Sequence, residues 1–282
     1  MSKKSASQTA LLIAAYRARI TEKPDALIND PWAAALSGEA GSELARSFDE
    51  SFPHMELWVA LRIAYLDRQL RRFVAEREMD QIVLLGAGLD TRAARMARPG
   101  LRFFEVDHPA SQGDKRERLS TIDGYPLDDL TLVACDFEHD DFVERLVAAG
   151  FASDRPAVIV WEGVTPYLTE DAVRATLAGV AQGCDPRCVL MFDYLERRMV
   201  RDAELKDSAK LSRDFVGTLG EPVTFGTNDP LPLLADAGFR MVETVTFDEI
   251  CLTLTGTYKR DYQFRFQHIA IASCTPPAWL TS

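Results

Sequence analysis

The feature that most constrains this fold is the apolar run Ile82–Leu85, which leads directly into Gly86-Ala87-Gly88. A short apolar run that ends in closely spaced glycines, with an amphipathic segment behind it, predicts a strand, a tight turn and a helix start. Glycine at such a turn lets a ligand approach the main chain, because no Cβ intrudes. The pattern is typical of a nucleoside-type ligand bound at the carboxyl end of a parallel sheet.

A second strand, predicted over Phe103–Val106, ends in an acid at Asp107. Asp107 follows Gly86 by about 20 residues, the offset at which an acid on the next strand meets a ribose diol. Glu105 and Asp107 point to the same side, since strand side chains alternate. Asp107 lies nearer the carboxyl end, so we predict that it accepts both ribose hydroxyls; a solvated strand cap is the alternative.

Apolar runs with helical segments between them recur about every 20 to 30 residues, a spacing that fits βαβ units and a parallel sheet. The runs are Ile82–Leu85, Phe103–Val106, Leu132–Cys135, Ala157–Trp161 and Cys188–Phe192. Two further strands are predicted over Phe239–Phe247 and Phe264–Ser273, as an antiparallel hairpin edge. We therefore predict an α/β fold, with a Rossmann-like, mostly parallel seven-stranded sheet and helices on both faces.

The chain before the first strand has a helical pattern. Thr9–Arg17 has a helix-forming composition, Asp30-Pro31 marks a turn and a new helix start, and Glu56–Glu78 has a helical period. We predict that residues 1–78 form a helical cap and that residues 79–282 form the Rossmann-like core. The polar helical stretch that follows the fifth run predicts a lid over residues 196–220.

Composition narrows the classes of partner and location. A net charge of −11 argues against nucleic acid, which needs a basic face. No apolar run approaches the roughly 18 residues that span a membrane, and no signal-peptide stretch is present, so we expect a cytoplasmic protein. The five cysteines are scattered, as expected of free thiols in a reducing compartment. Neither they nor the four histidines have metal-ligand spacing, and we expect no metal.

Acids also follow the third and fourth predicted strands. Asp136, in Cys135-Asp136-Phe137, is placed to flank a bound adenine, with a turn or helix-cap role as the alternative. The fourth strand ends at Glu162-Gly163, and the loop behind it would face the reactive end of a cofactor. A buried acid there is costly without a cation. S-adenosylmethionine, with its sulfonium and its ammonium, would supply one.

The glycine turn alone leaves other functions open. The dinucleotide fingerprint needs a third glycine where this chain has Thr91, and no Tyr-x-x-x-Lys pair is present, which argues against an NAD(P)-dependent oxidoreductase. A non-catalytic binding protein on the same scaffold predicts loss of Asp107, Asp136 or Glu162, and all three are present. The missing third glycine favours a methyltransferase, whose first turn is looser, and the oxidoreductase and the binding protein remain the alternatives.

Several motifs in this sequence resemble those of the leucine carboxyl methyltransferase superfamily, especially its bacterial branch of polyketide O-methyltransferases and S-adenosylmethionine-dependent methyltransferases. They run in order through residues 9–195, and the last third of the chain carries little of the pattern. The motifs are Thr9-Ala-Leu, Ala15-Tyr-Arg17-Ala, Asn29-Asp30-Pro31-Trp-Ala-Ala, Leu61-Arg62, Tyr65-Leu-Asp67, Leu85-Gly-Ala-Gly-Leu-Asp-Thr-Arg92, Phe104-Glu-Val-Asp107-His-Pro109, Lys115, Asp136-Phe137, and Trp161-Glu162-Gly163-Val-Thr-Pro-Tyr167-Leu168.

The resemblance implies a class I O-methyltransferase that uses S-adenosyl-L-methionine and releases S-adenosyl-L-homocysteine. Carried over by position, it implies that the cofactor-binding residues are Arg17 and Arg62 at the methionine carboxylate, Gly86, Ala87 and Gly88 at the turn, Asp107 and His108 at the ribose side, Asp136 and Phe137 at the adenine, and Glu162 and Gly163 near the methionine ammonium.

The methyl acceptor is less constrained than the cofactor. We predict acceptor contacts, as catalytic candidates, from Tyr167, Tyr194 and Arg198, which follow the fourth and fifth strands; packing or solvation is the alternative for each. A carboxylate acceptor needs no base at neutral pH, whereas a hydroxyl does. The resemblance favours a small acceptor of the polyketide or natural-product type. The protein-methylating members, which recognise a C-terminal leucine carboxylate, provide the alternative.

Overall fold

The computed structural model describes residues 7–76, 79–126, 130–137, 139–200, 207–258 and 264–275. A seven-stranded sheet of order β3-β2-β1-β4-β5-β7-β6 lies at its centre. Strands β1 to β5 are parallel, and β7 is antiparallel to both β5 and β6. All seven predicted strands are present, with ends shifted by a few residues: β1 Gln81–Leu85, β2 Arg102–Asp107, β3 Leu130–Ala134, β4 Val158–Trp161, β5 Val189–Leu195, β6 Met241–Thr246 and β7 Gln267–Ser273.

The last two strands pair antiparallel at the edge of the sheet, as predicted, but a helix joins them in place of a hairpin turn. Helix α10, Phe247–Thr255, begins directly after β6, where Thr246 and Glu249 exchange the two hydrogen bonds of a capping box. That helix-start signal ends the strand and leaves no tight turn. The chain returns through α10, and β7 enters between β5 and β6.

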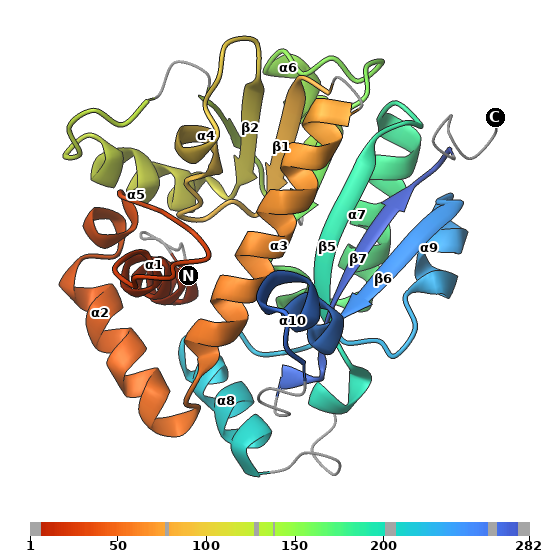
Figure 1. Cartoon of the computed structure of the whole chain (residues 1–282). Coiled ribbons are helices and arrows are strands. Elements are labelled where there is room, and N and C mark those ends of the chain that lie inside the picture. The colour runs from red at the N-terminus through yellow and green to blue at the C-terminus, as the bar shows by residue number, and fades with distance from the viewer. Residues whose placement is uncertain are drawn as a thin grey trace.

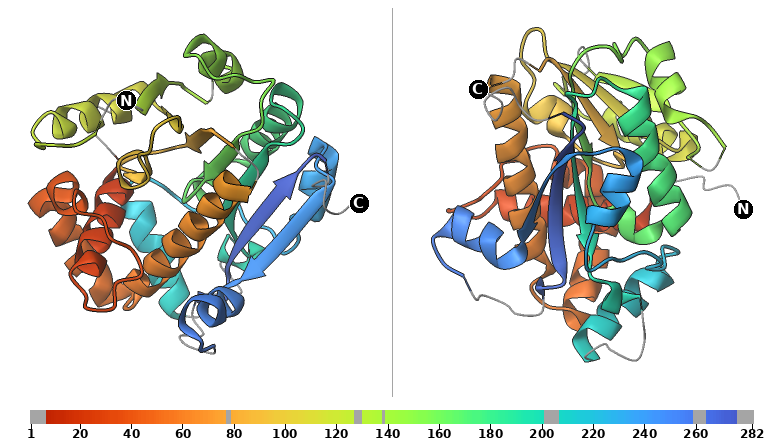
Figure 2. Two further views of the ribbon diagram at one scale, coloured as in Figure 1. Left: turned by 45° about the horizontal axis from the view of Figure 1, so that its top comes forward. Right: turned by 90° about the vertical axis from the view of Figure 1, so that its right-hand side faces the viewer.

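Helices cover both faces of the sheet, as predicted. Figure 1 and the right view of Figure 2 show α3 and α10 on one side, with α7 and α9 on the other. A hydrophobic core lies on each face of the sheet, and successive side chains of a strand pack into opposite cores. In β1, Ile82 and Leu84 pack on the side of α3, while Val83 and Leu85 pack on the side of α6, α7 and α9. The helices are α1 Gln8–Thr21, α2 Ala33–Ser51, α3 Met55–Glu76, α4 Arg92–Arg95, α5 Pro109–Leu119, α6 Phe142–Ala148, η1 Thr165–Tyr167, α7 Glu170–Gly183, η2 Arg197–Met199, α8 Asp207–Thr218, α9 Leu231–Ala237 and α10.

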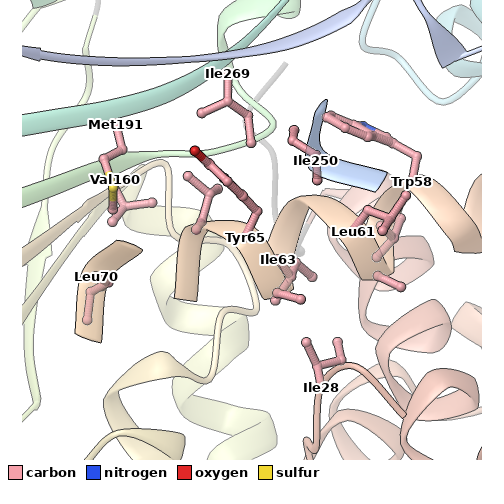
Figure 3. Packing of buried hydrophobic residues seen from close by; sticks show 14 of the residues in the cluster. Ile28, Trp58, Leu61, Ile63, Tyr65, Leu70, Val160, Met191, Ile250 and Ile269 are labelled. Atoms are coloured by element: carbon pink, nitrogen blue, oxygen red, sulfur yellow. The ribbon is translucent and has the colours of Figure 1, made fainter. Parts of the chain in front are cut away.

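Helix α3 is the element that joins the N-terminal helices to the sheet. Its apolar residues recur at helical spacing, and Leu61 and Tyr65 are buried with Val160, Met191 and Ile269 of the sheet (Figure 3). A helix buried along this much of its length holds its polar residues in fixed positions. This rigidity matters below, because α3 also carries charged side chains that point to the carboxyl ends of the strands.

Helices α1 and α2 lie beside the carboxyl end of β1. A Cβ built on Gly88 would lie 3.3 Å from the Cβ of Ala10 in α1. Helix α8 lies next to α2 (Figure 1), where Phe215 meets Phe48 edge-to-face at 4.9 Å between ring centroids. The predicted lid over residues 196–220 thus contains η2 and α8, and its residues 201–206 lie outside the described part. None of the helices in the described ranges has the length and apolarity needed to cross a membrane.

Candidate active site

The turn after β1 has the conformation that its glycines predict. Gly86 and Gly88 have φ of 66° and 50°, a region that favours glycine. The N–H groups of Gly86 and Ala87 donate to the carbonyl of Val106 at 2.8 and 3.3 Å, which joins the turn to β2. The turn therefore presents main chain, with no Cβ at the two glycines, at the carboxyl edge of the sheet.

Asp107 lies at the end of β2 against this turn. Its carboxylate accepts the N–H of Gly88 at 2.5 Å and the N–H of His108 at 2.6 Å. Burial raises the pKa of Asp107, and these two hydrogen bonds oppose the rise. Nε2 of His108 lies 4.0 Å from Oδ2 of Asp136, so the structure brings together three of the residues predicted for the nucleoside half of the cofactor.

Phe137 follows directly and is partly buried. Its ring centroid lies 6.1 Å from that of Phe142 in α6, at an angle of 42°. The residue before Asp136 is held to β2, because the N–H of Cys135 donates to the carbonyl of Asp107 at 2.9 Å. Asp136 and Phe137 are thus placed beside the ribose-side acid by main-chain pairing of β2 and β3.

A network of buried ion pairs occupies the ends of β1, β4 and β5. Arg62 of α3 donates from Nε to Glu162 and from Nη1 to Asp193, both at 2.9 Å. Arg92 of α4 reaches Glu162 at 2.6 Å. Arg92 also pairs with Asp90 and with Asp67, and Arg95 pairs with Asp67. The connected set therefore holds three arginines and four carboxylates.

The arginines of this network lower the pKa of two of its acids, Asp90 and Asp67. Burial alone would raise the pKa of Asp90, but Arg92, Arg95 and Arg17 outweigh it and lower the pKa of Asp90 to about 2. Burial is likewise outweighed at Asp67, whose pKa is lowered by Arg92 and Arg95. Asp67 and Asp90 are therefore ionised at neutral pH.

Arg17 makes a separate pair beside the same turn. Its Nε donates to Asp30 at 2.7 Å and its Nη2 to the carbonyl of Leu89 at 2.6 Å. Thr91 donates to the same carboxylate oxygen of Asp30 at 2.6 Å. These contacts hold α1 to the end of the glycine turn. They place Arg17 with Asp30, apart from the carboxylates that Arg62 contacts.

The loop after β4 is fixed from β5. Gly163 has φ of 69°, and its N–H donates to Oδ1 of Asp193 at 2.6 Å. The hydroxyl of Thr165 donates to the main-chain carbonyl of Asp193 at 2.6 Å. Tyr167 ends this loop. Burial and the nearby charge of Glu221 raise its pKa, so the phenol is protonated at neutral pH.

Two segments close around this loop. The N–H groups of Thr224 and Phe225 donate to the carbonyl of Pro166 at 2.8 and 3.1 Å, and the N–H of Thr227 donates to Leu195 at 2.8 Å. Near the start of α1, the hydroxyls of Ser7 and Thr9 donate to the two carboxylate oxygens of Glu221. The N-terminal helix and the segment after α8 are therefore tied together at the site.

The structure places two of the three acceptor candidates away from this cluster. Tyr194 is buried on the opposite face of β5 from Asp193 and stacks on His268 at 5.2 Å between ring centroids. Arg198 forms an ion pair with Glu196 at 2.6 Å. Only Tyr167 lies within the electrostatic reach of Arg62 and Asp193.

Sequence reasoning assigned no role to several residues of the network. Asp193 is the clearest case, because it interrupts the apolar strand Val189–Leu195 with a charge. A charge inside a buried strand needs a partner, and this signal was available. Asp67, Asp90 and Arg92 were also in the sequence motifs quoted above, but only the fold brings them together.

Comparisons with known proteins give the family and the fold of this chain. The model of the leucine carboxyl methyltransferase family matches residues 10–181, more than half of the chain. A Streptomyces coelicolor protein named "Putative S-adenosyl-L-methionine-dependent methyltransferase" is 37% identical over 182 residues, which cover 62% of this chain and 64% of that protein. A Mycobacterium relative with the same descriptive name is 34% identical over 200 residues, 65% of each chain. The alignments thus span just under two thirds of these relatives' lengths.

Solved structures give the same answer for the fold. A DUF574 family protein from Streptomyces avermitilis has a TM-score of 0.67 at 12% identity, over 96% of this chain and 98% of that chain. A structure from Thermobifida fusca, named as a "putative methyltransferase", has a TM-score of 0.60 at 18% identity, over 96% and 95% of the two chains. At these identities the likeness concerns the fold alone, and it confirms the predicted class I methyltransferase architecture.

Proposed function

Because the chain belongs to the leucine carboxyl methyltransferase family, we propose that it binds S-adenosyl-L-methionine and methylates an oxygen of a small-molecule acceptor. The cofactor would lie along the glycine turn, with its adenosine toward Asp107 and Asp136 and its amino-acid end toward Arg62 and Glu162. The observation that carries the proposal is the charge of the buried network, in which four carboxylates face three arginines.

That imbalance suits this cofactor. A buried carboxylate without a full counter-charge is costly, so the network favours a cationic ligand. S-adenosylmethionine carries a sulfonium, an ammonium and a carboxylate, which leaves one net positive charge. A nicotinamide dinucleotide carries phosphates and would add negative charge. The network therefore supports the sulfonium cofactor over the dinucleotide.

The residues at the turn fit an adenosine group. Gly86, Ala87 and Gly88 offer main chain at the strand end, and the Asp107 carboxylate can accept from ribose hydroxyls. At the other end, Arg62 uses Nε and Nη1 for Glu162 and Asp193. Its Nη2 lies 3.4 Å from the position that a Cβ on Gly163 would take, so this side of the guanidinium faces the β4 loop. Arg62 would hold the cofactor's carboxylate there.

When bound, the cofactor supplies an electrophilic methyl group for in-line displacement by the acceptor oxygen. The chain's part is to position the acceptor and to exclude water. Tyr167, whose raised pKa keeps the phenol protonated, would donate a hydrogen bond to the acceptor rather than remove its proton. The contact of Ser7 and Thr9 with Glu221 joins the start of α1 to the segment after α8 and would help to exclude water.

A small acceptor is favoured by where the family match ends. The match stops at residue 181, before η2, α8 and the segment that crosses the strand ends at 224–227. Of these elements, the segment 224–227 contacts the loop after β4 at Pro166 and would line the acceptor side of the site. Recognition of a protein C-terminus therefore does not carry over with the matched part, and a polyketide or natural-product acceptor is our proposal.

The first test is calorimetric titration with S-adenosylmethionine, S-adenosylhomocysteine and NADPH. We expect micromolar binding of both adenosyl ligands, lost in Asp107→Ala. Asp141→Ala is the matched control, since Asp141 caps α6 through Val143 and Glu144, and its loss affects local stability only. Binding of NADPH instead of the adenosyl ligands would overturn the proposal in favour of an oxidoreductase.

The acceptor is then sought by methyl transfer to a panel of phenols, alcohols and carboxylic acids, read by mass spectrometry. A peptide with a C-terminal leucine belongs in the same panel. We expect transfer to small molecules and none to the peptide. Transfer to the peptide alone would replace the small-molecule proposal by protein carboxyl methylation.

A further inference from the structure

Asp193 joins three elements of the site through one side chain and its own carbonyl. Oδ2 accepts Nη1 of Arg62 at 2.9 Å, and Oδ1 accepts the N–H of Gly163 at 2.6 Å. The carbonyl of Asp193 accepts the hydroxyl of Thr165 at 2.6 Å. One residue of β5 thus fixes a side chain of α3 and two points of the loop that carries Glu162.

Packing alone does not account for an acid here. Asp193 is 1% exposed, and Met191 and Leu195, which share its face of β5, are apolar core residues. Burial raises the pKa of Asp193, against the pull of Arg62 and of the Gly163 N–H. An apolar residue would pack in this position without that cost, and buried ion pairs add little net stability. The contacts of Asp193 are better explained by the geometry that they impose.

The geometry that they impose concerns two groups at the amino-acid end of the proposed cofactor site. Arg62 is held in a fork between Asp193 and Glu162, which turns its remaining Nη2 toward Gly163. Gly163 has a φ of 69°, and its N–H is held toward β5 by the hydrogen bond to Asp193. Both orientations depend on the same carboxylate.

We propose that Asp193 is a positioning residue for the amino-acid end of the cofactor, acting through Arg62 and Gly163. The proposal rests on the proposed function, because it needs an adenosyl ligand with an amino-acid end. Asp193 contributes to binding of the amino-acid end and contributes nothing to binding of the adenosine.

The test compares two product-like ligands by calorimetry. S-adenosylhomocysteine has the amino-acid end, whereas 5′-methylthioadenosine has the same adenosine and sulfur without it. Asp193→Asn keeps an oxygen for the Gly163 N–H but turns an amide donor toward Arg62. We expect about a ten- to hundredfold loss of affinity for S-adenosylhomocysteine, as for loss of a hydrogen bond to a charged group, and a change of less than about twofold for methylthioadenosine.

Asp107→Ala serves as the opposite control, because the ribose is common to both ligands and both affinities should fall. The fold of each variant is checked by circular dichroism. If Asp193→Asn does not fold, Asp193→Ser, which removes the charge but leaves Arg62 intact, should show the same selective loss. Equal loss of both ligands, or loss of neither, contradicts the positioning role. Wild-type protein that binds neither ligand would instead overturn the proposed function itself.

Discussion

Gly86 and Val164 are in such close contact that a Cβ on residue 86 would lie 2.4 Å from Cγ2 of Val164. The turn after β1 and the loop after β4 are therefore in direct contact at the carboxyl edge of the sheet. The first is proposed to hold the nucleoside half of the cofactor and the second its amino-acid half. Their contact fixes the distance between the two halves of the site.

Gly86→Ala should lower the free energy of unfolding by about 3 kcal/mol, from the unfavourable φ of 66° together with the clash with Val164. Urea denaturation measures it. Gly100→Ala is the matched control, because Gly100 also has a positive φ, of 82°, but nothing lies within 4 Å of its built Cβ. It should cost only about 1 kcal/mol and leave ligand affinity unchanged. Equal losses in the two variants would show that the Val164 contact does not matter.

Arg92→Ala should destabilise the protein by about 3 to 5 kcal/mol, because it leaves Asp67, Asp90 and Glu162 buried with less counter-charge. The comparison is Arg155→Ala, which breaks the exposed pair with Asp80 and should change stability by less than about 1 kcal/mol. Chemical denaturation of both variants at one pH gives the difference. A loss at Arg92 no larger than that at Arg155 would mean that water or rearrangement compensates the acids.

The buried pair of Glu105 and Lys115 should make stability depend on pH. Burial raises the pKa of Glu105 to about 7, although Lys115 opposes the rise. Between pH 4.5 and 7 the folded state therefore holds a proton that the unfolded chain has released, so the free energy of unfolding falls as pH rises. Relative to Glu105→Gln, which does not titrate, the wild type should lose up to about 3 kcal/mol across that window. Parallel denaturation curves at several pH values measure this, and a difference that stays flat with pH contradicts it.

The contact of Ser7 and Thr9 with Glu221 should control how fast ligand enters and leaves. This contact joins α1 to the segment after α8, and we expect ligand exchange to break it. Glu221→Ala should then speed both association and dissociation of S-adenosylhomocysteine several-fold and change its equilibrium affinity little. Stopped-flow fluorescence measures the two rates. Glu249→Ala is the control, since Glu249 caps α10 with Thr246. A change in affinity with unaltered rates would assign Glu221 to ligand contact instead.

Much of the fold could be predicted from local sequence. Each strand of the parallel part is a short apolar run, and the glycines after Leu85 and the acid after Val106 locate the strand ends. Their grouping at one edge follows from parallel pairing, which is why Asp107 and Asp136 were found together. The final strands were less predictable, because the helix that separates them starts with a capping signal inside an apolar stretch.

The ionic network could not be predicted in the same way. Arg62, Arg92 and Asp193 come from α3, α4 and β5, and no local pattern relates their side chains. Tyr194 shows the converse difficulty. It is adjacent to Asp193 in sequence, but strand alternation turns it into the other core. Asp193 therefore lies in the ionic network, whereas its neighbour Tyr194 lies on the other face of the sheet.

The segment from Thr224 to Thr227 crosses the strand ends through main-chain hydrogen bonds, and a Cβ on Gly226 would lie 2.9 Å from the carbonyl oxygen of Glu196. Its path thus depends on backbone atoms, on one glycine and on the buried side chains of Phe225 and Thr227. Because the main chain makes these contacts, exposed positions such as Thr224 can change in evolution without moving the backbone that passes over the ends of β4 and β5.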